Sequence, residues 1–333
     1  MKHRTHLQSA VVLSVLVAAL SGATAWVASS AAGQRQPAAT SARPQTPADP
    51  TELVVVFQRQ KDPTQVRADA DRFAQALSRE LGMPVSATVP VDYSASVQAL
   101  VSRKADLAYV SAMPFLLARR DGGARILLAE SRRSVSDGTF RTSYDSVWVV
   151  AADSPLKSYD DLVRSARTVR LAFTSPTSTS GYIMPLARFV AEGVVRPGQD
   201  VREVFGQVAF GGSYTAALEQ VLLGRADAAA VSDYVMEGEK ADVYLPAEKR
   251  QRLRVLARTP GVPTHVLAVR GGLSEAFVGR LREAVLKVAR EEPQLLAAVY
   301  GATRLVEVDE DAHVRAAVEA IERTGIPVEG LAR

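Results

Sequence analysis

The chain has 333 residues, of which 47% are hydrophobic and 23% are charged, the balance of an ordinary globular protein, and its length allows about two domains at about 150 residues each. It contains no cysteine and only four histidines, which excludes disulfide frameworks and thiolate metal centres and leaves little for a histidine metal site or a Ser–His–Asp centre. The formal net charge of +4 is too small to indicate nucleic-acid binding.

The first segment is typical of a targeting sequence rather than of a fold. Residues 1–4 carry two basic side chains, and a mostly apolar run follows over residues 10–28, which is the layout of a secretory signal. We expect residues 1–32 to be a signal peptide cleaved near Ala32, or an uncleaved anchor, because a run of this length can also span a bilayer. Residues 33–51, rich in Pro, Ala, Ser and Thr, are expected to form a flexible linker to an exported body.

From residue 52 onward, short apolar runs alternate with longer amphipathic stretches. This alternation predicts an α/β body with parallel sheets covered by helices on both faces. The strands are expected at residues 53–57, 85–89, 107–110, 126–129, 146–152, 168–173, 201–208, 228–231, 253–257 and 265–269. The helices are expected at residues 64–81, 93–102, 181–192, 215–223, 274–288 and 312–323. A similar helix–Asp–strand junction occurs at residues 103–108 and 224–229, which indicates two lobes of like construction.

Residues 173–182 carry the clearest chemical signal. They read Phe-Thr-Ser-Pro-Thr-Ser-Thr-Ser-Gly-Tyr, between a predicted strand and a predicted helix. The first turn of a helix has unpaired N–H groups and a partial positive charge, and Ser and Thr add neutral donors, so this segment suits a phosphate-like oxyanion. A simple capping role for one hydroxyl is the alternative. The segment contains no Lys or Arg, so anion binding here would depend on neutral donors.

The body resembles the phosphonate-binding proteins, which are the substrate-binding components of phosphate, phosphonate and phosphite ABC transporters. The resemblance covers about residues 52–300 and is carried by Lys104–Ser111, Tyr144–Val147, Pro176–Tyr182, Phe210–Ser213, Gly224–Val231 and Asp233. It implies an α/β, two-lobed type II periplasmic-binding-protein fold with a hinge crossed twice and a ligand cleft between the lobes. The implied bounds are residues 52–145 plus 265–333 for lobe 1 and residues 146–264 for lobe 2.

The resemblance also implies roles for individual residues. The Ser178, Thr179, Ser180 and Gly181 loop would grip the oxyanion. The other ligand-binding candidates are Tyr93, Ser111, Tyr144, Ser213, Tyr214 and Asp233. Core packing of the tyrosines in lobe 1 and the hinge, and a turn or cap role for the aspartate, remain open alternatives.

The chain departs from the family pattern at one place. Family members usually carry a His and then an acidic residue where this chain has Tyr214 and Thr215. Two neutral hydroxyls therefore replace a cation and a carboxylate, so recognition of a ligand amine is not expected.

We therefore expect a periplasmic or otherwise extracytoplasmic protein that captures phosphate, phosphite or a phosphonate by hinge closure and delivers it to an ABC transporter permease. The alternative is a membrane-anchored ligand-sensing module with the same fold. An enzyme is not expected, because we find no plausible nucleophile–base pair and no cofactor lysine motif. We expect a monomer with no cofactor, metal or nucleic-acid partner, in which His265 is structural.

Overall fold

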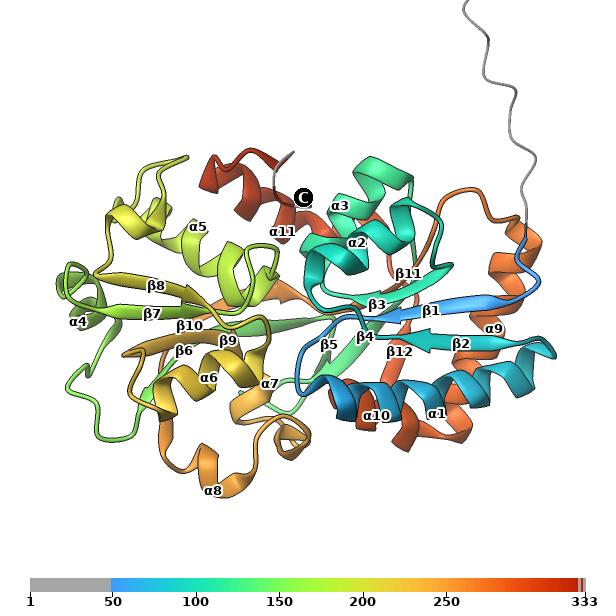
Figure 1. The fold of residues 1–333 in the computed structure, drawn as a ribbon, viewed down its shortest axis with the longest axis horizontal. Helices are drawn as coiled ribbons and strands as arrows, with labels where there is room; N and C mark the ends of the chain where they lie inside the picture. Colours follow the sequence, from blue (N-terminus) through green and yellow to red (C-terminus); the bar gives the residue numbers. More distant parts are fainter. Residues whose placement is uncertain (1–48, 329–330, 332–333) are drawn as a thin grey trace, which may run out of the picture. The chain divides into compact units, whose positions relative to one another are not determined.

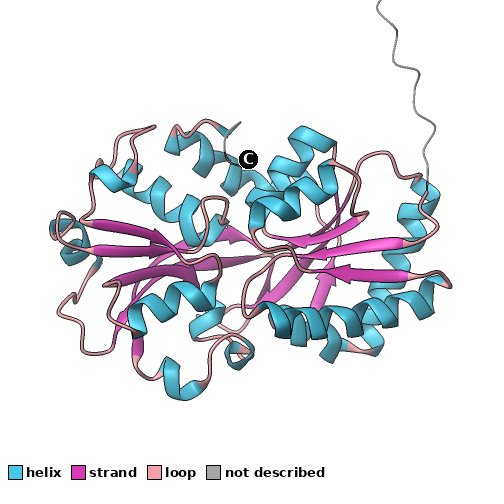
Figure 2. Ribbon diagram, in the orientation of Figure 1, coloured by secondary structure: helices cyan, strands magenta, loops and turns pink. Residues whose placement is uncertain are grey.

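The computed structural model describes residues 49–328 and residue 331. The expected signal peptide or anchor and nearly all of the expected linker therefore lie outside the described residues. Within the described part, the strands form two separate mixed sheets, each with helices on both faces (Figures 1 and 2). No helix in this part combines the length and the hydropathy needed to cross a membrane.

The first sheet has the strand order β12-β4-β11-β3-β1-β2, with β5 paired to β4. Its strands are β1 (Leu53–Phe57), β2 (Val85–Thr88), β3 (Leu107–Val110), β4 (Arg125–Arg133), β5 (Phe140–Arg141), β11 (Val266–Val269) and β12 (Arg304–Val306). The helices that follow its strands are α1 (Pro63–Leu81), α2 (Tyr93–Val101), α3 (Ala112–Gly122), α9 (Glu275–Glu291), α10 (Pro293–Tyr300) and α11 (Glu310–Thr324).

The second sheet has the strand order β10-β6-β9-β7-β8. Its strands are β6 (Ser143–Ala151), β7 (Arg170–Phe173), β8 (Gln207–Phe210), β9 (Ala228–Ser232) and β10 (Leu253–Pro263). The helical segments between them are α4 (Tyr159–Arg164), the π-turn η1 (Thr179–Ile183), α5 (Met184–Ala191), η2 (Val201–Glu203), α6 (Tyr214–Leu222), α7 (Asp233–Met236), η3 (Ala241–Val243) and α8 (Ala247–Arg250).

The central strands are parallel, as expected for apolar strands buried on both faces. β1 pairs in parallel with β2 and β3, and β7 pairs in parallel with β8 and β9. The expectation of parallel sheets is confirmed for these strands and wrong for β6 and β11, which run antiparallel to their neighbours. These strands follow the two places where the chain passes from one sheet to the other, after β5 and after β10.

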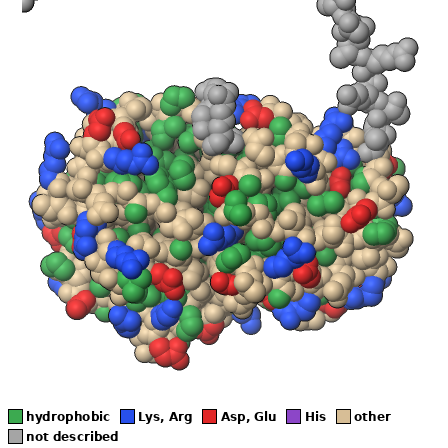
Figure 3. Space-filling view, in the orientation of Figure 1, with side chains coloured by type: hydrophobic (Ala, Val, Ile, Leu, Met, Phe, Trp, Pro, Cys, Tyr) green, Lys and Arg blue, Asp and Glu red, His purple; other side chains and the backbone are tan. Residues whose placement is uncertain are grey.

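Helix ends follow ordinary capping chemistry. In α1, the Asp62 carboxylate accepts hydrogen bonds from the N–H groups of Thr64 and Gln65, and the helix ends at Gly82 with φ of 64°, the left-handed conformation that glycine adopts at little cost. Charged side chains of both signs are mixed over the visible face in Figure 3. That mixture agrees with the small net charge and marks no single-sign surface on this face.

Some predicted elements differ from the structure. The strand expected at residues 201–208 is wrong over its first half, because Val201–Glu203 forms a short 3-10 helix and the strand is Gln207–Phe210. The helix α3 was not predicted, although it begins directly after β3. Its position matters, because its first turn lies at the candidate site.

Candidate ligand-binding site

The Ser/Thr loop after β7 is fully buried rather than on the outer surface. Thr177, Ser178, Thr179 and Ser180 each have 0% exposed surface. The Ser178 hydroxyl accepts a hydrogen bond of 3.0 Å from the Gly181 N–H, so this residue caps the π-turn. The capping alternative is thus observed for one hydroxyl, and the two that follow it point to other partners.

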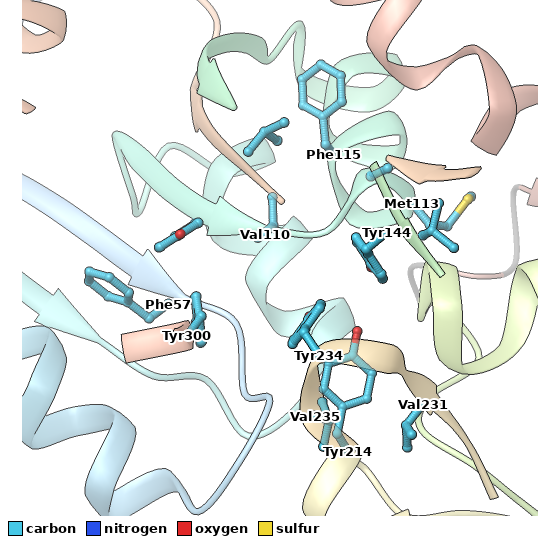
Figure 4. Close-up of a cluster of buried hydrophobic side chains, with 14 of the residues drawn as sticks. Phe57, Val110, Met113, Phe115, Tyr144, Tyr214, Val231, Tyr234, Val235 and Tyr300 are labelled. Carbon is cyan, nitrogen blue, oxygen red and sulfur yellow. The ribbon is translucent and has the colours of Figure 1, made fainter. Parts of the chain in front are cut away.

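The Ser180 hydroxyl is the centre of a hydroxyl cluster on the second lobe. Its Oγ lies 3.0 Å from the Tyr214 hydroxyl, 2.9 Å from the Ser232 Oγ and 3.4 Å from the Tyr144 hydroxyl. These partners come from α6, β9 and β6. Figure 4 shows the rings of Tyr144 from β6, Tyr214 from α6 and Tyr234 from α7 gathered together. The cluster therefore depends on the fold and not on one local motif.

The first lobe contributes a second group of polar atoms. Ser111 precedes α3, and both its N–H (3.0 Å) and its hydroxyl (3.2 Å) donate to the Gln58 Oε1. This pairing fixes the Gln58 amide, so its Nε2 is left as a donor without a hydrogen-bond partner among the described residues. The Gln60 Nε2 and the Tyr93 hydroxyl are also buried without a partner of ordinary hydrogen-bond geometry in this part of the chain, although the Gln58 side chain lies close enough to Tyr93 to lower its pKa slightly against the effect of burial. Buried donors without partners are rare, and three of them close together could be satisfied by one bound acceptor.

The two lobes meet directly at these residues. The Met113 N–H at the start of α3 donates to the Thr179 Oγ1 at 2.8 Å. On the other side, the Tyr214 N–H donates to the Gln60 backbone oxygen at 3.1 Å. The loop, the hydroxyl cluster and the glutamines therefore lie on facing walls of one inter-lobe site.

Several neutral hydrogen-bond donors of the site lie at the N-terminal ends of helices. Tyr93 begins α2, Met113 lies in the first turn of α3, and Tyr214 begins α6, and each such turn carries a partial positive charge. Burial raises the pKa values of Tyr93 and Tyr144 well above the ordinary value, so both hydroxyls stay protonated and can donate.

Cationic side chains stay outside the hydroxyl cluster. None of the hydrogen bonds of the described residues joins a Lys or Arg to Ser180 or its hydroxyl partners. The charge of Arg59 reaches Tyr93 only weakly, as a minor effect that lowers its pKa, and the Arg59 guanidinium donates to the Val91 backbone oxygen at 3.3 Å. The Arg59 Nε, between Gln58 and Gln60 in the chain, is itself buried without a hydrogen-bond partner among the described residues, so one cationic donor lies beside the neutral ones.

Not every predicted site residue joins this arrangement. The Ser213 hydroxyl accepts from the Ala216 N–H at 3.1 Å and caps α6. The Asp233 carboxylate accepts from the Tyr234 N–H at 2.7 Å, and its charged neighbours are Asp145 and Arg258. Among the described residues, the Asp233 carboxylate thus has no hydrogen bond to the Ser180 cluster, although it lines the same cavity as Tyr144.

The side chains at the two positions where the family usually carries a His and an acid have different hydrogen-bond partners. The Tyr214 hydroxyl faces Ser180, whereas the Thr215 hydroxyl donates to the Tyr244 backbone oxygen at 3.2 Å. Only the first of them is available to the site. In the described ranges, no group of three or more His, Asp or Glu side chains could hold a metal ion.

Gln58 and Gln60 were not among the predicted site residues. A signal for them was present, because they directly follow the buried strand Leu53–Phe57, and ligands of open α/β sheets bind at the carboxyl ends of such strands. Their role depends on contacts with Ser111 and with the second lobe, which the sequence does not show.

Comparison with known proteins identifies the architecture. Residues 55–313 match the family described as "ABC transporter, phosphonate, periplasmic substrate-binding protein". The chain belongs to this family. The family consists of binding components of transporters rather than enzymes, so this chain is an extracytoplasmic substrate-binding protein.

Individual relatives of this phosphonate-binding family member are distant. The phosphate-import protein PhnD of Mycolicibacterium smegmatis is 22% identical over 80% of this chain and 79% of that protein. A binding component of a Pseudomonas aeruginosa ABC phosphonate transporter superposes with a TM-score of 0.71, 21% identity, and coverage of 83% of this chain and 87% of that one. PhnD1 of Prochlorococcus marinus, solved with methylphosphonate, gives a TM-score of 0.70 at 20% identity, covering 83% and 98% of the two chains. These likenesses confirm the two-lobed type II fold.

Proposed function

We propose that this protein captures a small phosphorus oxyanion between its lobes and delivers it to the permease of an ABC transporter. The observation that carries the proposal is a group of buried donors without a partner of ordinary hydrogen-bond geometry in the described part, namely the Gln58 Nε2, the Gln60 Nε2 and the Tyr93 hydroxyl, with the Arg59 Nε beside them. They face the Ser180 hydroxyl cluster, whose loop contacts α3 of the first lobe. An anion between these walls would supply the missing acceptors.

Binding here would depend on hydrogen bonds and helix ends rather than on ion pairs. Closure of the lobes removes water, and hydrogen bonds to a charged group then contribute about 1.5–3 kcal/mol each. The loop Ser178–Gly181, with Gln58, Gln60, Ser111, Tyr93, Tyr144 and Tyr214, forms the proposed shell. We leave Asp233 out of it because its carboxylate is bonded to the Tyr234 N–H and, among the described residues, has no hydrogen bond to the Ser180 cluster.

The proposed ligand class is phosphate, phosphite or a simple phosphonate. The relatives named above carry phosphate import and methylphosphonate in their descriptions, and both ligands present the same tetrahedral oxygens. The Ser180 cluster consists of hydroxyl groups and contains no carboxylate, so a ligand amine has no partner there. Sulfate shares the shape of phosphate and is therefore the necessary comparison ligand.

The proposal also covers delivery. The protein would be secreted by its N-terminal signal or held at the membrane through residues 10–28, and would act as a monomer on a membrane permease. The apolar run and the polar linker that follows it support this arrangement.

Tyr93→Phe tests the proposed site with one atom removed. Because the Tyr93 hydroxyl is buried without a partner of ordinary hydrogen-bond geometry among the described residues, its loss should leave the unfolding midpoint nearly unchanged or raise it. Calorimetric titration of the full chain with methylphosphonate, phosphite, inorganic phosphate and sulfate should show binding of at least one phosphorus ligand. The variant should weaken that binding by about ten- to a hundredfold.

Tyr159→Phe is the matched control. The Tyr159 hydroxyl is also buried without a partner of ordinary hydrogen-bond geometry, but its ring packs against Phe189 in the second lobe. This variant should bind like the unaltered chain. Equal affinity of Tyr93→Phe, or no binding of any phosphorus ligand by the unaltered chain, would contradict the proposal.

A further inference from the structure

The last helix, α11, lies between the two lobes. The chain reaches it from β12, a strand of the first sheet. The helix nevertheless packs along α5 and against β10 and η1 of the second lobe, as well as against α3 of the first. Figure 1 shows it in this position, beside α5 and α3. Its buried side chains are Val314, Ala317, Ala320, Ile321 and Thr324. The helix therefore forms a link between the lobes in addition to the two strand crossings.

The N-terminal end of α11 is held by the first lobe. The Glu310 carboxylate accepts from the Arg119 guanidinium at 3.1 Å and from the Ile126 N–H at 2.7 Å. Asp311 adds a second ion pair to Arg119 at 2.8 Å. Both carboxylates lie in the first turn of α11, where the helix dipole also favours negative charge.

The other end of α11 is held by the second lobe. The Thr324 backbone oxygen accepts a hydrogen bond of 2.8 Å from the Gly198 N–H. Gly325 follows with φ of 64°, and a Cβ at this position would lie 2.8 Å from the Gly198 nitrogen. Such a close approach of two backbone segments requires glycine. In between, the His313 Nε2 lies 3.1 Å from the backbone oxygen of Thr264, in the segment that joins β10 to β11.

Arg119, which anchors α11 to the first lobe, also connects this helix to the ligand site. Arg119 lies in the last turn of α3, and the first turn of α3 supplies the Met113 N–H to Thr179. Separating the lobes breaks the Met113–Thr179 contact at one end of α3. It must also release α11 from one of the lobes, because the helix is bonded to both.

We propose that α11 is a brace that spans the closed lobes and slows ligand release, with Arg119 and Glu310 as the pair that anchors it to the first lobe. The inference rests on the proposed function, since the brace acts on an opening motion that releases the ligand. It adds a positioning pair, Arg119 and Glu310, that does not touch the proposed ligand shell.

Arg119→Ala tests the brace through binding kinetics. Ligand release, followed by tryptophan fluorescence in stopped flow with methylphosphonate or inorganic phosphate as the probe, should become about two- to fivefold faster. The association rate should not change, because the ion pair acts after closure. Added NaCl should speed release from the unaltered chain more than from the variant, because the Arg119 side chain is 32% exposed and its ion pair is screened.

Two further variants separate the brace from a general loss of stability. Arg67→Ala breaks an exposed ion pair within α1 and leaves α11 untouched, so its release rate should equal that of the unaltered chain. Arg119→Lys keeps the charge and should restore most of the slow release. A release rate and salt dependence of Arg119→Ala equal to those of Arg67→Ala would overturn the proposal.

Small-angle X-ray scattering of the ligand-free protein tests the brace separately from the proposed ligand-binding function. If no probe binds the unaltered chain, the proposed function fails, and the radius of gyration in small-angle X-ray scattering then decides the brace. A larger radius for Arg119→Ala than for Arg67→Ala would support it. An equal radius would overturn it.

Discussion

Asp233 is a buried carboxylate in an environment that opposes its charge. Burial, together with the neighbouring Asp145, raises its pKa to about 6, and only 4% of the residue is exposed. An acid whose pKa is raised in the folded state binds more protons there than in the unfolded chain. The free energy of unfolding therefore falls as the pH rises from about 4 to about 6, and it stays at the lower value above that range.

Asp233→Asn should remove this loss. Urea unfolding at pH 7 should show a gain of roughly 2–3 kcal/mol, because a shift of about two pKa units is worth about that much. The gain should vanish below about pH 4, where both forms are neutral. Asn keeps an oxygen for the Tyr234 N–H, so the local hydrogen bond survives. Equal stability of the two proteins at pH 7 would show that the charge of the buried Asp233 carboxylate does not destabilise the fold.

Single residues could be predicted where they belong to a recognisable local motif. The order of hydroxyls around Ser180 predicted a polar loop before a helix, and the structure has one. The partners of that serine were only partly predictable, because Tyr214 and Tyr144 were named while Ser232 was not. Ser232 occupies the last position of a buried strand, and its direction depends on the pairing of β9 with β6.

At the scale of elements, the π-turn η1 shapes the candidate site. Gly181 lies within it, and its N–H is bonded to the Ser178 hydroxyl at 3.0 Å. A Cβ at Gly181 would overlap the Thr174 hydroxyl and lie 2.8 Å from the Ser178 Oγ. Thr174 cannot turn away without losing its bond of 3.1 Å to the Ala230 backbone oxygen. The turn therefore requires glycine at this position for reasons of space.

Gly181→Ala should widen the turn and disturb Ser178 and Ser180 together. We expect a loss of about 1–3 kcal/mol in unfolding free energy, as for overpacked sites, and at least about tenfold weaker binding of the probe ligands. Gly279→Ala is the matched control, because a Cβ there meets nothing within 4 Å in α9, and it should stabilise the protein by about 0.5–1 kcal/mol. Unchanged calorimetric affinity of Gly181→Ala would remove the turn from the site.

Elements with a clear hydrophobic period were predicted well, and short or irregular ones were not. The helix over residues 64–81 and the strand over residues 53–57 match α1 and β1 closely. The helix α3 was missed because Pro114 and two arginines interrupt an otherwise apolar stretch. Packing against the first sheet compensates for the weak helix propensity of this segment. Such tertiary packing cannot be seen from the local sequence.

At the scale of the whole molecule, one buried ion pair lies next to a segment that connects the two lobes. Glu130 of β4 has 0% exposed surface and accepts from Arg132 at 2.5 Å and 3.1 Å. Its backbone N–H donates to the His265 oxygen at 2.9 Å, in the segment between β10 and β11. Arg132 in turn lies 3.9 Å from the Tyr234 ring, on the second lobe. This ion pair of β4 thus adjoins both the β10–β11 crossing and the second lobe.

The sequence could not indicate these contacts. Glu130 and Arg132 are close in the sequence, but their contacts to His265 and Tyr234 span more than a hundred positions, and Arg132 resembles an ordinary surface charge beside Arg133. The two-lobed fold itself was predictable because the family resemblance covers most of the body. The position of α11 between the lobes was not, because an amphipathic helix shows that it has a buried face but not what covers that face.

Glu130→Gln should destabilise the whole molecule, because it leaves the Arg132 charge buried without its partner. Burial alone would raise the pKa of Glu130, but the charges of Arg132 and His265 hold it at about 2. A carboxylate with a lowered pKa contributes stability above the unfolded value of about 4, and that contribution is lost as the pH falls towards 2. Urea unfolding at pH 7 should therefore show a loss of about 3–5 kcal/mol, and the difference should shrink steadily from about pH 4 downward. Asp71→Asn breaks an exposed ion pair and should cost about 1 kcal/mol or less. If the two variants were equally stable at pH 7, the ion pair beside the β10–β11 crossing would be dispensable, and the apolar faces of the sheets alone would hold the connection in place.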